Sequence, residues 1–223
     1  MNKKSIIILR VFIILALAGL IAWIFYFLYQ IGSEESYSQN SQSGLKVYQN
    51  PEYGFEISYP ENLIATTTFQ SYYHLNSDWR ADAFPETSGK GIVSIPVYRI
   101  ENRGKNGEFV SYPMYFDAEL RIGASSDPKD LEACLSAYNE TATGTEIIKG
   151  ITFSKFIIQN AGMMQYVQGV SYRTIHNNVC FALEQLKTGS SYRDVPNPND
   201  IPDSVLDSYY NQIPSIIKTF EFE

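Results

Sequence analysis

The sequence contains few cysteines and histidines, two residue types on which much enzyme chemistry depends. Among its 223 residues are only two cysteines and two histidines, and these are scattered along the chain. No group of them has the spacing of a zinc site. The signatures of serine hydrolases, zinc proteases, phosphate-binding loops and dinucleotide-binding folds are also missing. We therefore predict that the chain is not an enzyme, with no catalytic residue, no metal site and no cofactor.

Histidine is the base that a reactive cysteine most often needs, and neither histidine is well placed for that role. His176 precedes Cys180 by four residues but falls in a predicted turn, where its side chain should point to solvent. His74 lies in a polar stretch that we expect to be a loop. Both histidines are therefore interpreted as surface residues.

Positive charge is scarce beyond the first 31 residues. Of the 17 basic and 24 acidic residues, three basic and no acidic ones fall within residues 1–31. This leaves 14 basic against 24 acidic residues in the remainder. Such a region repels the phosphates of nucleic acids and anionic headgroups, so we predict no nucleic-acid partner.

Charge of either sign is missing from residues 11–29. A helix of that length, with a rise of about 1.5 Å per residue, matches the ~30 Å hydrocarbon thickness of a membrane. The basic residues before it keep the N-terminus in the cytoplasm by the positive-inside rule. The sequence predicts a cytoplasmic N-terminus over 1–10, a transmembrane helix over 11–31, and an extracytoplasmic remainder in the cell membrane.

A cleaved signal peptide is the alternative interpretation of this apolar run. Signal peptides normally have a shorter apolar region that ends in small residues, whereas residues 25–29 read FYFLY. We therefore expect an uncleaved anchor. Residues 32–44 are rich in Ser, Gln and Asn, which is typical of a flexible linker. The soluble domain is expected over residues 45–223.

Alternation of apolar and polar residues dominates the predicted domain. Phe55, Ile57 and Tyr59 alternate with polar residues behind a Pro–Gly turn, which predicts a hairpin over 46–60. Because most connections resemble hairpins, we predict an α+β domain with a mainly antiparallel sheet flanked by helices. Further strands are expected over 92–100, 112–122, 145–156, 163–175, 179–186 and 219–222, and helices over 126–138 and 204–217, the second kinked or frayed in its last turn by Pro214.

The segment 48–60, YQNPEYGFEISYP, resembles the opening of PsbP-like domains. The end of the chain, a helix that runs into IIKTFEF over 216–222, is also similar. The resemblance implies an α/β/α sandwich around an antiparallel sheet. It also implies a binding or assembly factor, often at a membrane-bound complex, and not an enzyme. It supplies no catalytic residue, and the stretch 65–112 departs from the compact pattern of the family.

Cys134 and Cys180 leave two alternatives open. An exported domain reaches an oxidising compartment, where pairing is favoured. Cys134 lies on the inward stripe of the first predicted helix, and Cys180 lies on the strand face opposite Phe181. If both faces of the sheet are covered, the two thiols can meet, and the bridge would stabilise the domain by a few kcal/mol. Otherwise they are buried free thiols that act as small apolar residues.

A possible partner surface is predicted in the polar stretch 65–90. It consists of four aromatic residues, of the kind that often anchor interfaces: Tyr72, Tyr73, Trp79 and Phe84. The alternative is that these rings pack on the edge of the domain.

The leading hypothesis is a membrane-anchored, extracytoplasmic, non-catalytic binding or scaffolding module of a bacterial envelope, with a protein or cell-wall partner. One alternative is a cell-envelope hydrolase with an unrecognised active site. Another is a weak cation or small-ligand receptor that uses the loop carboxylates Asp194, Asp200 and Asp203, although these lack the dense spacing of a calcium loop.

Overall fold

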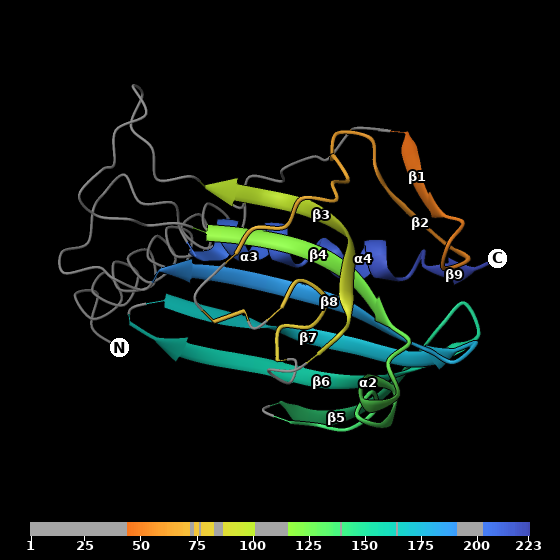
Figure 1. Ribbon diagram of the computed structural model, residues 1–223. Helices are drawn as coiled ribbons and strands as arrows, with labels where there is room; N and C mark the ends of the chain where they lie inside the picture. Colours follow the sequence, from red (N-terminus) through yellow and green to blue (C-terminus); the bar gives the residue numbers. More distant parts are fainter. Residues whose placement is uncertain are drawn as a thin grey trace, which may run out of the picture. The chain divides into compact units, whose positions relative to one another are not determined.

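The computed structural model describes most of the region from residue 44 to the C-terminus, and residues 43–223 form one compact unit (Figure 1). Within this described part, no helix is both long enough and apolar enough to cross a membrane. The predicted cytoplasmic segment 1–10, the transmembrane helix 11–31 and the linker up to residue 43 lie outside it. The described residues are 44–71, 74–75, 77–82, 87–100, 116–138, 140–163, 165–190 and 203–223.

The described strands form two sheets in which every pairing is antiparallel (Figure 1). This confirms the predicted antiparallel arrangement. The small sheet has the order β1-β2-β9, with β1 Leu45–Asn50, β2 Phe55–Pro60 and β9 Glu221–Phe222. The large sheet has the order β3-β4-β8-β7-β6-β5, with β3 Lys90–Ile100, β4 Phe116–Ser125, β5 Thr141–Ile148, β6 Ile151–Gly162, β7 Gln165–His176 and β8 Val179–Ser190.

The predicted hairpin over 46–60 is confirmed as β1 and β2. Its turn is held by the side chain of Asn50, which accepts a hydrogen bond from the Tyr53 amide at 3.0 Å. Gly54 follows with φ of 61°, a conformation that glycine adopts without strain. The last strand, β9, pairs with β2, so the two ends of the domain meet in the small sheet.

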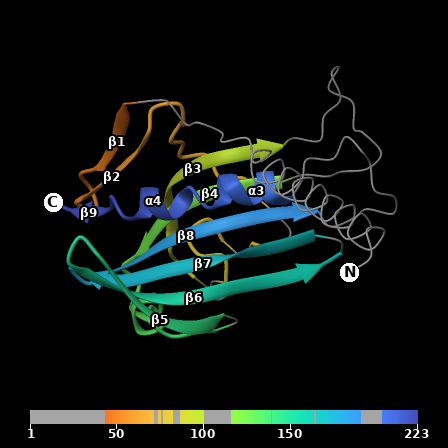
Figure 2. The same cartoon turned by 180° about the vertical axis from the view of Figure 1, so that it is seen from behind.

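The large sheet has one apolar face. Along β4 the apolar residues alternate with polar ones, so that Leu120 and Ile122 point to one side and Glu119 and Arg121 to the other. Against the apolar side lie α3 (Asp203–Tyr210), α4 (Ile213–Ile217) and the small sheet (Figure 2). Together they enclose the main core, which includes Phe55, Ile57, Val93, Ile95, Leu120, Ile122, Phe153, Leu183, Ile216 and Phe220.

The opposite face of the large sheet is covered mostly by irregular chain. Here we call the described residues between Glu61 and Gly89 the covering segment; it crosses this face in Figure 1. Beside it lies α2 (Pro128–Glu132), a short helix whose N-terminus is capped by Asp127. Helices thus lie on both faces, but α2 is only five residues long. The α/β/α sandwich implied by the resemblance is therefore met only in part.

Two predicted elements are divided in the structure. The strand expected over 145–156 is a hairpin, because Lys149 and Gly150 both have positive φ and turn the chain between β5 and β6. The helix expected over 204–217 is two helices, α3 and α4. The helix breaks just before Pro214, in keeping with the expected kink, and Pro214 lies in the first turn of α4, where its missing N–H costs no hydrogen bond.

Candidate functional site

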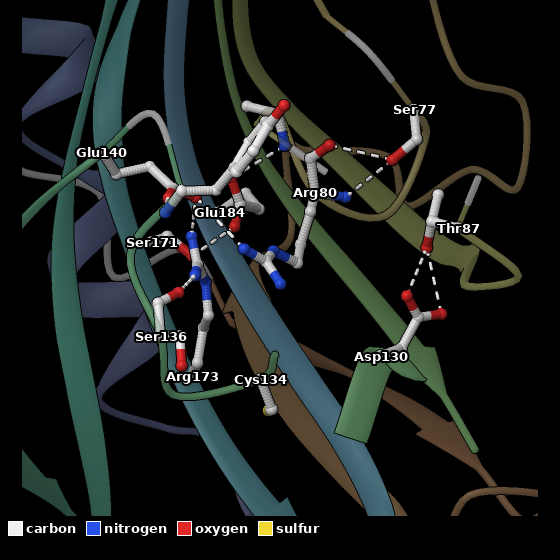
Figure 3. A network of polar contacts seen from close by, with 12 residues as sticks. Ser77, Arg80, Thr87, Asp130, Cys134, Ser136, Glu140, Ser171, Arg173 and Glu184 are labelled. Carbon is white, nitrogen blue, oxygen red and sulfur yellow. Dashed lines mark hydrogen bonds and ion pairs between the residues drawn. The ribbon is translucent and has the colours of Figure 1, made fainter. Parts of the chain in front are cut away.

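A cluster of charged residues lies between the covering segment and the large sheet (Figure 3). Arg173 of β7 and Arg80 of the covering segment both bind the carboxylate of Glu140, the second at 3.3 Å. Ser171 donates a hydrogen bond to Glu184 of β8. All five side chains are buried. We call this set, together with Asp82, the ion-pair cluster.

The ion-pair cluster contains three carboxylates and two guanidinium groups. Burial raises the pKa of Asp82 to about 6; the nearby charges of Glu140 and Glu184 also raise it, whereas Arg173 and Arg80 lower it. Burial likewise raises the pKa of Glu184. Burial opposes ionisation of Glu140 as well, but Arg173, the Tyr138 amide and Arg80 hold the pKa of Glu140 below its usual value. The three carboxyl groups of the cluster therefore differ in pKa, which is raised for Asp82 and Glu184 and lowered for Glu140.

The substitution Asp82→Asn is expected to remove part of the pH dependence of folding stability. The pKa of Asp82 is higher in the folded state, so its contribution is complete below about pH 4 and is lost as pH rises through about 6. Wild type should therefore lose on the order of 2 kcal/mol relative to the Asp82→Asn variant between pH 4.5 and 7.5. Urea titrations at both pH values measure this difference, and parallel curves for the two proteins would contradict it.

The two cysteines form a disulfide, with their Cα atoms 5.8 Å apart. This confirms the alternative in which Cys134 and Cys180 meet and form a bond. The bridge is fully buried and packs against Trp79 of the covering segment. The Trp79 side chain has no exposed surface, and its Nε1 donates to the Thr87 hydroxyl at 2.8 Å. Trp79 is therefore not part of an exposed partner surface, and for this residue the alternative, packing on the domain, holds. Tyr72, Tyr73 and Phe84 lie outside the described residues, so the rest of the predicted surface stays a prediction.

Glycines on β4 and at the start of β3 make room for the Trp79 ring. A Cβ atom on Gly89 would lie 2.2 Å from the ring, and one on Gly123 would lie 2.6 Å from the Trp79 Cα. Beyond the ring, the Thr87 hydroxyl donates to Asp130 of α2 at 2.9 Å (Figure 3). Asp130 also accepts from Ser125 at 2.6 Å. The covering segment is therefore fastened at both Trp79 and Thr87.

The substitution Gly123→Ala is expected to lower the free energy of unfolding by about 2–3 kcal/mol. The added methyl group would meet backbone atoms of Trp79, which cannot rotate away, so the covering segment must shift. Gly44→Ala is the matched control, because a Cβ there meets only the flexible side chain of Glu61. Denaturant unfolding of both variants measures the costs, and equal costs would contradict the predicted contact.

A second group of buried polar side chains lies on β3 and β4, at the edge of the large sheet that β3 forms. Arg121 of β4 binds Glu119 through Nε at 2.6 Å, and its Nη2 donates to the Gln70 carbonyl at 2.6 Å. Its guanidinium carbon lies 5.6 Å from the centre of the Phe69 ring. The Ser94 hydroxyl donates to the other oxygen of Glu119 at 2.5 Å. Arg121 is therefore held in one orientation by both the sheet and the covering segment.

Arg121 lines an open cavity of about 630 Å³ beneath the covering segment. Most of the lining is polar, and Lys90 and Asp78 contribute the other charged side chains. The remaining residues of the lining are Thr67, Phe69, Gln70, Ser71, Leu75, Ser77, Thr87, Gly89 and Gly91. This volume lies within the ~300–1,000 Å³ that is typical of small-molecule sites. The cavity is the candidate binding site of the domain.

The histidines are placed as ordinary packing residues. His74 Nε2 donates to the Gly162 carbonyl at 2.9 Å, and His176 stacks on Phe222 with the ring centres 3.9 Å apart. Cys180 is bonded to Cys134, so it is no nucleophile for His176.

The loop carboxylates of the predicted cation receptor are only partly described. Within the described residues, no three His, Cys, Asp or Glu side chains come together as a metal site. Asp194 and Asp200 lie outside those residues, and Asp203 begins α3.

Sequence reasoning missed both the ion-pair cluster and Arg121. A signal for them does exist in the chain. Along β4, Asp117, Glu119 and Arg121 alternate with apolar residues, and Arg173 follows Ser171 by two positions in β7. Such alternation usually indicates a face in contact with water. Here the covering segment makes that face an interior one.

No protein-family model and no curated protein matches the chain. Among solved structures, the solution structure of cyanobacterial PsbP (CyanoP) from Synechocystis sp. PCC 6803 is similar. The likeness covers 86% of this chain and 99% of that protein, with a TM-score of 0.35 and 12% sequence identity. PsbP also gives its name to the family that residues 48–60 and 216–222 resemble.

Proposed function

We propose that the chain is a non-catalytic binding module on the outer face of a bacterial membrane, anchored by residues 11–31. The observation that carries this proposal is the arrangement of charge on the covered face of the large sheet. The guanidinium groups of Arg80 and Arg173 bind the carboxylate of Glu140, the Glu184 side chain accepts from Ser171 and from the Ala81 amide, and all of these charged groups are buried. They serve to fasten the covering segment and do not face a substrate.

The open cavity that Arg121 lines has the features of a binding site. Its described lining offers hydroxyl groups, backbone and two cationic side chains, Lys90 and Arg121. It includes no pairing of a nucleophile with a base among the described residues. A polar, open cavity with such a lining suits the binding of a ligand. This favours a binding module over the alternative of a cell-envelope hydrolase.

The buried disulfide supports an extracytoplasmic location. Disulfides persist in oxidising compartments and are rare in the cytosol. The bond between Cys134 and Cys180 is enclosed by Trp79 and Leu131, so it belongs to the interior of the fold. Export also agrees with the uncharged run over residues 11–29 and the basic residues before it.

The proposal is tested by protease treatment of intact cells stripped of their wall, with a tag at each end of the chain. We expect external protease to remove the C-terminal tag and to spare the N-terminal tag. In-membrane crosslinking followed by mass spectrometry then identifies the protein or cell-wall partner. A protected C-terminal tag, or full-length protein in the soluble cytosol, would overturn the proposed location.

A further inference from the structure

We propose that the open cavity beneath the covering segment binds a small ligand through a carboxylate or phosphate group, with Arg121 as its anchor. This inference rests on the proposed function and deepens it, because it assigns a ligand class to the binding module. It is argued from the charge, the orientation of Arg121 and the lining of the cavity.

The cavity is locally cationic in a region that is acidic overall. Beyond residue 31 the chain has 24 acidic and 14 basic residues. The described lining of the cavity reverses this balance, with Lys90 and Arg121 against the single carboxylate of Asp78. Glu119 binds the Nε of Arg121 from within the sheet, and burial raises the pKa of Glu119. An anion is therefore attracted to this cavity more than to the surrounding surface.

Arg121 is oriented before any ligand arrives. Its Nε is bound to Glu119 and its Nη2 to the Gln70 carbonyl, each at 2.6 Å. The Phe69 ring lies against its guanidinium. A guanidinium has five N–H groups in a fixed plane, and the bonds to described residues use two of these donors. Only 1% of the Arg121 side chain is exposed, and Arg121 lines the cavity, so an oxygen of a carboxylate or phosphate would reach the remaining donors from the cavity.

The rest of the lining favours a small polar ligand. Thr67 and Ser71 contribute hydroxyl groups, and Gly89 and Gly91 have no side chains to keep a ligand from the backbone. Two cationic side chains disfavour a metal ion or an organic cation. The polar walls disfavour an apolar molecule, which gains affinity chiefly from apolar contact.

The experiment is isothermal titration calorimetry on the full chain in detergent micelles, at constant ionic strength because salt screens such binding. The probes are sodium acetate and inorganic phosphate, with choline as the cationic control. Saturable binding of acetate or phosphate is expected, and choline should give none. Tighter binding of acetate assigns a carboxylate ligand, and tighter binding of phosphate assigns a phosphate ligand.

Matched charge variants then locate the site. Gln70→Glu adds a carboxylate to the cavity wall and keeps the backbone carbonyl that binds Arg121. Gln159→Glu makes the same change on an exposed position of β6, outside the cavity lining. The first variant should weaken probe binding by about fivefold or more, and the second by less than about twofold. If the Gln70→Glu variant does not fold, Lys90→Gln is an independent test at an exposed position. It should weaken binding of the acetate or phosphate probe by about two- to threefold.

The inference would be overturned by an absence of saturable anion binding, by equal binding of choline, or by equal losses in the Gln70→Glu and Gln159→Glu variants. None of these results bears on the membrane topology, which the protease experiment tests separately.

Discussion

Replacing Cys134 and Cys180 together with alanine is expected to lower the free energy of unfolding by about 4 kcal/mol. The disulfide joins residues 46 positions apart. Closing a loop of that length removes chain entropy from the unfolded state worth about 4 kcal/mol. For a domain of this size the melting temperature should fall by roughly 8–16 °C. Thermal and urea unfolding of the double variant measure the loss.

The wild-type chain in the presence of a reductant provides the matched control. Because both sulfur atoms are buried, reduction should require partial unfolding, and added reductant should act slowly under native conditions. Once reduced, the wild type should melt near the temperature of the double alanine variant. If the alanine variant and the oxidised wild type melted together, the bridge would contribute nothing and the expected stabilisation would be wrong.

Some parts of the fold could be predicted because their signals are local. The hairpin of β1 and β2 follows from Asn50 and Gly54 in the turn and from the alternation after it. The antiparallel direction of the large sheet follows from short connections, such as Asn177–Asn178 between β7 and β8, where both residues have positive φ. In each case a few neighbouring residues determine the conformation.

The covered face of the large sheet could not be predicted, since its contacts join distant segments. Glu140 pairs with Arg80 and Arg173, which are 60 and 33 positions away along the chain. Before folding, each is an ordinary charged residue of the kind found on surfaces. Trp79 also stands in a polar stretch, and Gly89 and Gly123 leave space for it. A glycine in a strand does not reveal which ring will lie on it.

The disulfide could be predicted only in part, because it depends on both local patterns and a contact between distant segments. The orientation of Cys180 could be predicted from the alternation along β8. The sequence predicts Cys134 on the inward stripe of a helix over 126–138, but α2 ends at Glu132 and Cys134 lies in the turn that follows. Whether they meet depends on α2 lying over the polar face of the large sheet, which is a tertiary contact. The residues thus defined two alternatives, and the packing of α2 selects the bonded one.

Arg173→Met is expected to destabilise the domain by about 3–5 kcal/mol at pH 7.5, because it leaves buried carboxylates without their partner. Arg173 binds Glu140 and lies 4.1 Å above the Phe156 ring. Methionine keeps an apolar side chain at this position and removes the guanidinium, with its charge and its hydrogen bonds to Ser171 and the Ser136 carbonyl. Lys187→Met is the matched control, since Lys187 pairs with the half-exposed Asp207 of α3 and should contribute at most about 1 kcal/mol.

The cost of Arg173→Met should also depend on pH. In wild type the Arg173 charge lowers the pKa values of Glu140 and Glu184, so its loss raises both in the folded variant. A raised folded-state pKa means stability that is present at low pH and lost as pH rises. The variant should therefore recover part of its deficit at pH 5, and Glu140→Gln added to it should recover part of the deficit at pH 7.5. The deficit could instead be equal at both pH values and unchanged by the added Glu140→Gln substitution. That result would mean that packing, and not buried charge, holds the covering segment to the sheet.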